Sequence, residues 1–195
     1  RIGATTTWAM IARADLPPAC RALQEAARQV GGRQVQESAT IAGNLCNASP
    51  AADGMPPLLA LDAEVTLASS RGSRSLPLAA FVTGPRATAR ATDEIVTSLQ
   101  IPAPALAGRS RFLKLGARAH LVISIAMVAV RVDADGAGRI RQAALAVGAC
   151  GPVARRLPVR LVESGPAGGA ILAASIAAER NERKVLSFDM GGTTA

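Results

Sequence analysis

The chain has 195 residues and a hydrophobic fraction of 49%, enough for one medium-sized domain or two small ones. Aromatic residues make up only 2%, so the core must be built from Ala, Val, Leu and Ile. The formal net charge of +8 comes almost entirely from arginines that are spread along the chain. Since these few aromatic residues form no recognisable platform for base stacking, we expect a solvated basic surface and no nucleic acid binding.

The cysteines and the hydropathy pattern exclude further classes of protein. Cys20, Cys46 and Cys150 form no CxxC pair, so the sequence predicts no disulfide framework and no zinc or iron–sulfur site. Reduced thiols fit the cytoplasm. No apolar run reaches the ~18 residues that a membrane span needs, and no signal peptide is recognisable. We therefore expect a cytoplasmic protein without a membrane span or a metal site.

The first 107 residues predict an α+β domain. Residues 1–7 favour a strand, and Pro17-Pro18 favours a helix that runs to Val30 and ends at Gly31-Gly32. A polar, glycine-containing loop is expected next, and alternation then predicts a hairpin. The expected elements in chain order are a loop over residues 36–53, a helix over 56–61, hairpin strands over 64–68 and 73–76, and a strand over 94–101.

The residue pattern changes twice in the rest of the chain, after residue 107 and after residue 158. Residues 108–158 predict the start of a second small α+β domain, with strands over 111–117, 123–133 and 140–148. Asp135-Gly136 lies between the last two strands and is a strong hairpin signal. Residues 159–195 predict a helix, a buried strand and a glycine-rich turn. Trp8 is expected in the core, and Asp133 and Asp135 in solvent.

The segment from Thr40 to Asp53, TIAGNLCNASPAAD, carries the most chemical information. Glycine permits close backbone approach, and Asn and Ser side chains can bond a phosphate or a ribityl chain. A carboxylate at Asp53 can accept hydrogen bonds from hydroxyl groups. An ordinary turn-rich loop has the same composition, so the residues alone leave both interpretations open.

This segment resembles the flavin-contacting motif of molybdenum-hydroxylase FAD-binding subunits, the family that serves xanthine and carbon monoxide dehydrogenases. There, Thr-x-Gly-Gly-Asn-Leu is followed by Ser-Pro-x-x-Asp. The flanking sequence agrees with the family over residues 1–158. The further similar segments are Arg1-Ile2-Gly3-Ala4-Thr5-Thr6, Pro56 to Ala63, Glu94 to Pro102 and Phe112 to Arg118.

The resemblance implies a partial FAD-binding domain of the vanillyl-alcohol-oxidase type over residues 1–107. The start of the flavoprotein's small α+β C-terminal domain would follow over 108–158. It implies FAD as cofactor, partner subunits that carry iron–sulfur centres and molybdopterin, and NAD or another electron acceptor. It assigns no catalytic residue. The residues that it places at FAD are Thr40, Ile41, Gly43, Asn44, Asn47, Ser49, Asp53, Val96 on the isoalloxazine and Lys114 near the ring.

The sequence departs from the family pattern in three ways. Ala42 replaces the first of two glycines, and its methyl group either pushes the loop away from the pyrophosphate or is tolerated at a negative φ. Gln36-Glu37 stands where Arg-Asn is common. The family's earlier glycine-rich pyrophosphate loop would lie before Arg1. We therefore expect this chain to bind FAD weakly.

Residues 159–195 resemble a different family, the hydantoinase A and oxoprolinase proteins with an actin-like ATPase fold. The similarity rests on Glu163 to Gly169 and on Ser187-Phe188-Asp189-Met190-Gly191-Gly192-Thr193-Thr194, a strand followed by a phosphate loop. One such loop cannot form an ATPase, so we expect no ATP or Mg²⁺ at Asp189 and Thr193. The pattern suggests a junction of two truncated genes near residues 157–161.

Two alternatives to a flavin-binding subunit stay open at this point. One is a fragment of an ATP-dependent hydantoinase or oxoprolinase, and the other is a partly folded remnant without activity. A hydrolase that uses His120, the only histidine, is not expected, because no Gly-x-Ser-x-Gly elbow supplies a nucleophile.

Overall fold

The computed structural model describes residues 1–118 and 121–157, which belong to one unit, Arg1–Pro158. The predictions for His120 and for residues 159–195 lie outside these described ranges. No helix within the described ranges is long and apolar enough to cross a membrane.

The strand predicted over residues 1–7 is shorter than expected. Only β1 (Ile2–Gly3) forms a strand, and it pairs antiparallel with β6 (Ile95–Gln100). The chain then turns into α1 (Trp8–Arg13), which the sequence did not indicate. The reason is a cap: the Thr7 side chain accepts a hydrogen bond from Met10 N–H at 3.3 Å. The Trp8 side chain is 1% exposed, which confirms its predicted place in the core.

The helix predicted from the Pro17-Pro18 pair is present but divided. A 3₁₀ turn, η1 (Pro18–Cys20), leads into α2 (Arg21–Ala27). The apolar stripe of α2 is fully buried. Gly31 has a φ of +51°, a conformation that favours glycine, and so ends this region as predicted.

The prediction of a loop over residues 36–53 is wrong, because most of these residues lie in two helices. These are α3 (Arg33–Ser38) and α4 (Ile41–Asn47). Polar residues suggested a loop, but in α4 they occupy one face of an amphipathic helix. The helix predicted over residues 56–61 is confirmed as α5 (Met55–Ala60), with proline in its first turn.

The first sheet has four strands in the order β1-β6-β2-β3. The predicted hairpin is confirmed, with β2 and β3 antiparallel and Val65 opposite Leu76. The predicted strand over residues 94–101 is confirmed as β6. A short helix and a small hairpin, which the sequence did not indicate, follow β3. The bounds are β2 Glu64–Ser69, β3 Gly72–Pro77, α6 Leu78–Phe81, β4 Val82–Gly84, β5 Ala87–Thr88 and β6 Ile95–Gln100.

The second sheet is antiparallel, with the order β10-β9-β8-β7. The three predicted strands and the hairpin at Asp135-Gly136 are confirmed. Asp135 is not free in solvent, because its carboxylate accepts hydrogen bonds from the N–H groups of Ala137 and Arg139, both at 2.9 Å. The bounds are β7 Arg109–Leu115, β8 Ala126–Ala134, β9 Ile140–Gly148 and β10 Arg155–Leu157, with a 3₁₀ turn, η2 Ala103–Leu106, before β7.

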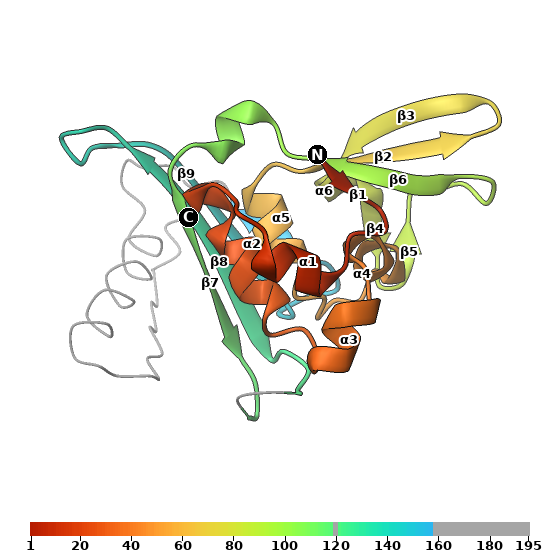
Figure 1. Cartoon of the computed structure of the whole chain (residues 1–195), viewed down its shortest axis with the longest axis horizontal. Helices are drawn as coiled ribbons and strands as arrows, with labels where there is room; N and C mark the ends of the chain where they lie inside the picture. The colour runs from red at the N-terminus through yellow and green to blue at the C-terminus, as the bar shows by residue number, and fades with distance from the viewer. Residues whose placement is uncertain (119–120, 158–195) are drawn as a thin grey trace, which may run out of the picture. The chain divides into compact units, whose positions relative to one another are not determined.

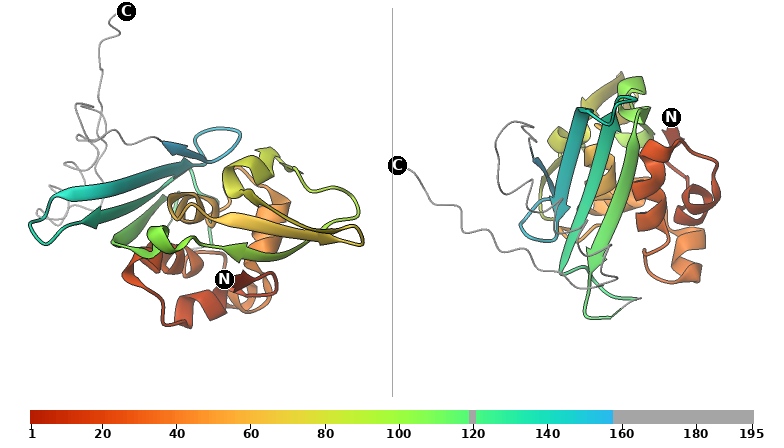
Figure 2. Two further views of the ribbon diagram at one scale, coloured as in Figure 1. Left: turned by 90° about the horizontal axis from the view of Figure 1, so that it is seen from above. Right: turned by 90° about the vertical axis from the view of Figure 1, so that its left-hand side faces the viewer.

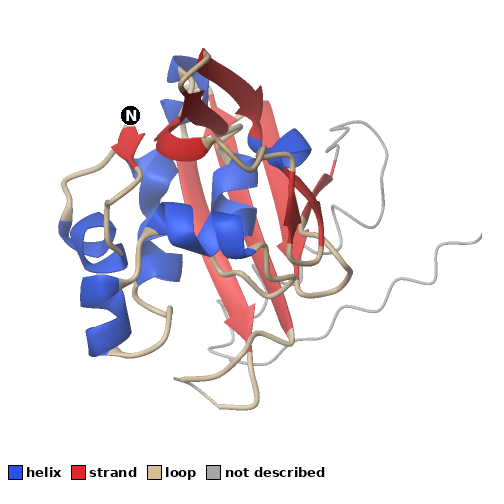
Figure 3. Cartoon of the chain, turned by 90° about the vertical axis from the view of Figure 1, so that its right-hand side faces the viewer, coloured by secondary structure: helices blue, strands red, loops and turns tan. Residues whose placement is uncertain are grey.

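The helices α2 and α5 pack on one face of the second sheet (Figures 1 and 3). Figure 2 (right) shows β7, β8 and β9 side by side, with the N-terminal helices on one side of them. The helix α5 contacts both β8 and β9. One hydrophobic cluster includes Trp8, Leu58, Leu99 and Phe112, and so links the helices to both sheets. This shared core holds the segment from α4 to α5 between the two sheets.

An ion pair between Arg74 and Glu94 stabilises the start of β6. Arg74 on β3 donates to both carboxylate oxygens of Glu94, at 2.6 and 2.8 Å. These bonds, with a further one from Ala91 N–H, lower the pKa of Glu94 to about 2. A carboxyl group with a lowered pKa in the folded state stabilises the fold only while it is ionised. Its contribution is full above the unfolded pKa of about 4.3 and is lost as the pH falls towards about 2.

We therefore expect Glu94→Gln to lower the thermal midpoint at neutral pH. The difference between variant and parent should shrink below about pH 4.3 and vanish only below about pH 2. Thermal unfolding followed by circular dichroism across this range tests the effect. A difference that stays constant with pH would show that the ionised carboxylate contributes nothing.

Candidate functional site

The helix α4 presents two different faces. Its inner face consists of Ile41, Ala42 and Leu45, whose side chains are at most 5% exposed. Its outer face carries Gly43, Cys46 and Asn47, which are all exposed. Of the residues that the sequence places at FAD, Ile41 is therefore a packing residue of α4 in this structure. The outer face is available to a ligand.

The start of α4 is fixed by the N-terminal segment. The Thr40 side chain caps the helix by accepting from Gly43 N–H at 3.1 Å. Ile41 N–H donates to the Thr6 carbonyl at 3.0 Å, and Trp8 N–H donates to the Ala39 carbonyl at 3.2 Å. These bonds hold Thr40 and Gly43 together and set the orientation of the outer face.

Ala42 is accommodated within α4. It lies in the helix, has no left-handed φ, and its methyl group is 5% exposed on the inner face. The structure therefore supports the second possibility given for Ala42, that its methyl group is tolerated because the backbone φ is negative. The methyl group does not project from the outer face.

Asn44 contains an orphaned polar atom. Its Oδ1 is buried and has no hydrogen-bond partner within the described part of the chain. It lies close to Gly54: a Cβ added there would be 3.0 Å from Asn44 Oδ1 and 2.5 Å from Trp8 Cη2. Glycine is needed at this point because any side chain would push the Asp53–Gly54 corner away from α4. A buried acceptor without a partner is rare, and a bound ligand is one means of satisfying it.

Asp53 and Lys114, 61 residues apart, are brought into contact as a buried ion pair. Lys114 Nζ lies 2.7 Å from Asp53 Oδ2, with side-chain exposures of 6% and 10%. Ser124 Oγ donates to Asp53 Oδ1 at 2.6 Å. Lys114 Nζ also lies 3.4 Å from the Gln29 carbonyl. The Asp53 carboxylate thus joins the loop after α4 to the second sheet.

The other predicted residues lie on separate elements. The Ser49 hydroxyl oxygen accepts from Ala51 N–H at 3.3 Å, which leaves its own O–H able to donate. Asn47 accepts a hydrogen bond from the guanidinium of Arg86 through Oδ1. Val96 is partly buried on β6, an element that contacts α4. Within the described residues, no hydrogen bond joins Val96 to Asp53 or Lys114.

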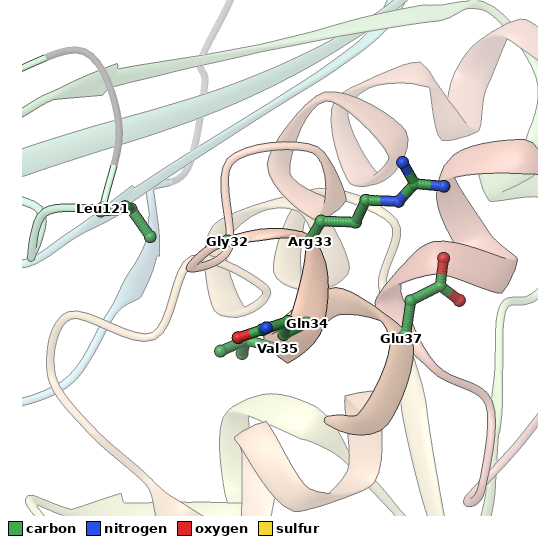
Figure 4. Close-up of a pocket in the computed structure, with 6 residues that line it drawn as sticks. All are labelled: Gly32, Arg33, Gln34, Val35, Glu37 and Leu121. Carbon is green, nitrogen blue, oxygen red and sulfur yellow. The ribbon is translucent and has the colours of Figure 1, made fainter.

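A shallow hollow opens elsewhere, between α3 and the segment after β7. Figure 4 shows that its lining comes from α3, the glycine before it and one leucine. None of the residues predicted to contact FAD is part of it. The lining residues are Gly32, Arg33, Gln34, Val35, Glu37 and Leu121.

The sequence did not indicate four residues that shape the candidate site. Trp8 and Gly54 back α4, Ser124 holds Asp53, and Arg86 holds Asn47. The Asp53-Gly54 pair carried a local signal, since this dipeptide is typical of tight corners. Ser124 and Arg86 lie 71 and 39 residues from their partners, and nothing local to them could have predicted these contacts.

The family comparison decides which ligand this site belongs to. Residues 1–104 match the family described as FAD binding domain in molybdopterin dehydrogenase. The chain belongs to this family. The match covers more than half of the chain and contains the whole Thr40–Asp53 segment. The resemblance inferred from the sequence is thus confirmed, and FAD is the cofactor that this family of domains binds. Residues 150–195 separately match the hydantoinase/oxoprolinase family, which confirms the second resemblance.

Individual relatives agree with the family assignment. The chain is 40% identical over 134 residues to the nicotinate dehydrogenase FAD-subunit of Eubacterium barkeri, covering 67% of this chain and 45% of that protein. It is 36% identical over 107 residues to the xanthine dehydrogenase FAD-binding subunit of Escherichia coli O157:H7, covering 52% and 35%. The chain thus spans less than half the length of these relatives. Both of them are named as subunits.

A solved structure shows the same fold. Reconstituted CO dehydrogenase from Oligotropha carboxidovorans matches with a TM-score of 0.73 at 23% identity, over 78% of this chain and 53% of that one. At this identity the likeness shows the fold alone, a mixed α+β arrangement. The mixed α+β class predicted from the sequence is therefore confirmed.

The residues present fit FAD on structural grounds. The outer face of α4 has a glycine where no side chain blocks approach, and Asn47 offers an exposed amide. The orphaned Asn44 Oδ1 can accept from a hydroxyl group. Each carboxylate oxygen of Asp53 accepts one hydrogen bond, from Lys114 or from Ser124, and retains a lone pair for another donor. A dinucleotide with phosphates and a ribityl chain matches this mixture of donors and acceptors.

Proposed function

We propose that this chain acts as the FAD-binding subunit, or part of one, in a molybdenum hydroxylase of the xanthine, nicotinate or carbon monoxide dehydrogenase type. In this proposal electrons arrive from iron–sulfur centres in a partner subunit, which drains a molybdopterin subunit. They leave to NAD or another acceptor. The observation that carries the proposal is the family match over residues 1–104, which contains the exposed face of α4.

FAD supplies the redox chemistry when it is bound, and the protein supplies binding and electrostatics. In the proposal Thr40, through its cap, keeps Gly43 available for close approach. Asn44, Asn47 and Ser49 hydrogen-bond the cofactor, and Val96 packs on its ring. Asp53 accepts from ribityl hydroxyls.

Lys114 has a restricted role in this scheme. Its ammonium group is bound to Asp53 and almost fully buried, so it acts near the flavin through this pair. A cation beside the bound cofactor stabilises negative charge that develops there. Lys114 also orients Asp53, and no proton transfer by Lys114 is needed.

The finer fold assignment belongs to the same proposal. We assign residues 1–107 to a partial FAD-binding domain of the vanillyl-alcohol-oxidase type and 108–158 to the start of the small α+β C-terminal domain. Residues 159–195 are assigned to an actin-like ATPase fragment, supported by the hydantoinase/oxoprolinase match. The cores of the first two parts are continuous, since Leu99 and Phe112 lie in one hydrophobic cluster.

A cytoplasmic location of the protein is also part of this proposal.

Cys46 provides a test of where FAD binds. It lies exposed on the outer face of α4, and Cys150, just after β9, is a second exposed thiol for comparison. Partial desolvation by neighbouring groups raises the pKa of the Cys46 thiol, so alkylation is best measured at alkaline pH. At a FAD concentration ten times the dissociation constant, we expect alkylation of Cys46 to slow about tenfold by mass action. The rate at Cys150 should fall less than the rate at Cys46, because Cys150 lies outside α4, although its neighbour Ala149 donates to the Pro50 carbonyl at 3.1 Å.

Peptide mass spectrometry after timed iodoacetamide treatment gives both rates in one sample. Unprotected Cys46 in a protein that binds FAD would exclude the outer face of α4 as the contact. Failure to bind FAD at all, by flavin fluorescence titration, would contradict the proposed function itself.

A second candidate function is supported by one observation. The match of residues 150–195 to the hydantoinase/oxoprolinase family leaves a fragment of an ATP-dependent enzyme of that type as an alternative. Calorimetric titration with ATP and Mg²⁺ separates the two: heat of nucleotide binding without flavin binding would favour this alternative. Sequencing the genomic DNA around the Pro158 codon tests whether the junction of the two families is present in the gene.

A further inference from the structure

Arg86 lies against the end of α4 in an unusual backbone conformation. It stands in the turn between β4 and β5 with a φ of +58°, and Ala48, just after α4, has a φ of +46°. Arg86 N–H donates to the Ala48 carbonyl at 2.9 Å. Non-glycine residues keep left-handed conformations only where the surrounding structure enforces them. A backbone hydrogen bond thus holds the β4–β5 turn against the end of α4, and this places the Arg86 side chain beside Asn47.

The contact between the two side chains fixes the orientation of an amide. The guanidinium of Arg86 donates through Nη1 to Asn47 Oδ1. Arginine has only donors, so the atom facing it must be the amide oxygen and not the amide nitrogen. The Nδ2 group of Asn47 is therefore directed away from Arg86. Without this partner, a half-turn of the amide would exchange the two atoms.

Asn47 belongs to the face of α4 that the proposed function assigns to the cofactor. Gly43 and Cys46 are exposed beside it, one helical turn away and adjacent in sequence. The oxygens of a diphosphate or a ribityl chain accept hydrogen bonds, so an amide oxygen turned outward would oppose a phosphate, whereas an amide N–H₂ group would bind it.

We propose that Arg86 is a positioning residue for the cofactor: it holds the Asn47 amide so that its N–H₂ group donates to an oxygen of bound FAD. This inference rests on the proposed function. It predicts that the identity of residue 86 affects FAD affinity through Asn47. It also predicts that a carboxylate at position 47 fails, although a carboxylate would pair with Arg86 at least as well as the amide does.

The test compares variants of the full chain by flavin fluorescence titration. Arg86→Ala should weaken FAD binding about tenfold, and Arg86→Lys should recover part of the loss, because one donor can still reach Asn47. Asn47→Asp should weaken FAD binding by about tenfold or more. Arg71→Ala is the matched control, since Arg71 is an exposed arginine on the β2–β3 turn, where it pairs with Asp93. It should leave the affinity unchanged within about twofold.

The double variant Arg86→Ala/Asn47→Ala distinguishes positioning from independent contacts. If Arg86 acts only through Asn47, the double variant binds FAD no more weakly than Asn47→Ala alone. Additive losses, an unchanged affinity in Arg86→Ala, or tight binding by Asn47→Asp would each overturn the inference and leave FAD binding itself intact. Thermal midpoints of the apoproteins should match within the series. A parent chain that binds no FAD would overturn both this inference and the proposed function.

Discussion

Replacing Asp53 with alanine is expected to lower the free energy of unfolding by about 3 kcal/mol and to abolish FAD binding as well. The reason is the position of Lys114, whose Nζ lies 2.7 Å from the carboxylate and whose side chain is 6% exposed. The alanine variant leaves this ammonium group buried with only the Gln29 carbonyl, at 3.4 Å, beside it. It also removes the acceptor for the Ser124 hydroxyl. Breaking one half of a buried pair is much more destabilising than replacing both halves.

Chemical denaturation of three variants separates the structural role of Asp53 from its role toward the cofactor. Asp53→Asn retains an oxygen for Ser124 but loses the charge, so we expect a smaller loss than for alanine. Adding Lys114→Met to Asp53→Ala removes the unpaired cation and should restore much of the stability. FAD binding should not return in that double variant. Full stability of Asp53→Ala with loss of FAD alone would show that the carboxylate serves only the cofactor.

The two predicted hairpins illustrate what local sequence can specify. The pairing of β2 with β3 follows from the alternation of apolar residues in β2 and the short turn after it, and the pairing of β8 with β9 follows from the Asp135-Gly136 turn. At Asp135 the turn is further fixed by the carboxylate, which accepts from two backbone N–H groups nearby. Both the pattern and the turn lie within about twenty residues, so no distant partner is needed to predict the hairpin.

The helices α3 and α4 show where prediction of secondary structure from the local sequence fails. Residues 36–53 have the glycine, asparagine and serine content of a loop, yet α4 forms because Thr40 caps it and its inner face is buried. Burial is supplied by tertiary packing, including the backbone bond from Ile41 to Thr6. Propensity is a weak predictor where such packing decides the conformation. The family resemblance identified the segment without indicating that it is helical.

The candidate site was predictable in residue type more than in arrangement. The resemblance indicated both Asp53 and Lys114, and the structure brings them together across 61 residues. It did not indicate that their charges pair, nor that Ser124 and Arg86 hold site residues in place. Contacts of this kind depend on the register of β7 against β8 and on the β4–β5 turn, which no single segment determines.

Replacing Arg131 with alanine is the second large effect that we expect, a loss of about 3 kcal/mol in the free energy of unfolding. Arg131 lies on β8 and its side chain is 0% exposed. Its Nε donates to the carbonyl of Ala60, the last residue of α5, at 2.9 Å. Alanine would leave that carbonyl without the bond and create a cavity under α5. Equilibrium denaturation with urea gives the loss directly.

Arg131→Met should be far less harmful than Arg131→Ala, because methionine fills most of the volume without a buried charge. Burial lowers the pKa of Arg131, and its Nη2 has no hydrogen-bond partner within the described residues, so desolvation of the guanidinium is incompletely compensated. Asp62, 3.6 Å from Arg131 Nη2, would not be left alone, since Arg156 Nε lies 3.0 Å from it. We therefore expect the methionine variant to stay within about 1 kcal/mol of the parent. If methionine were as destabilising as alanine, the bond to Ala60 rather than the filled volume would be what holds α5 on the second sheet.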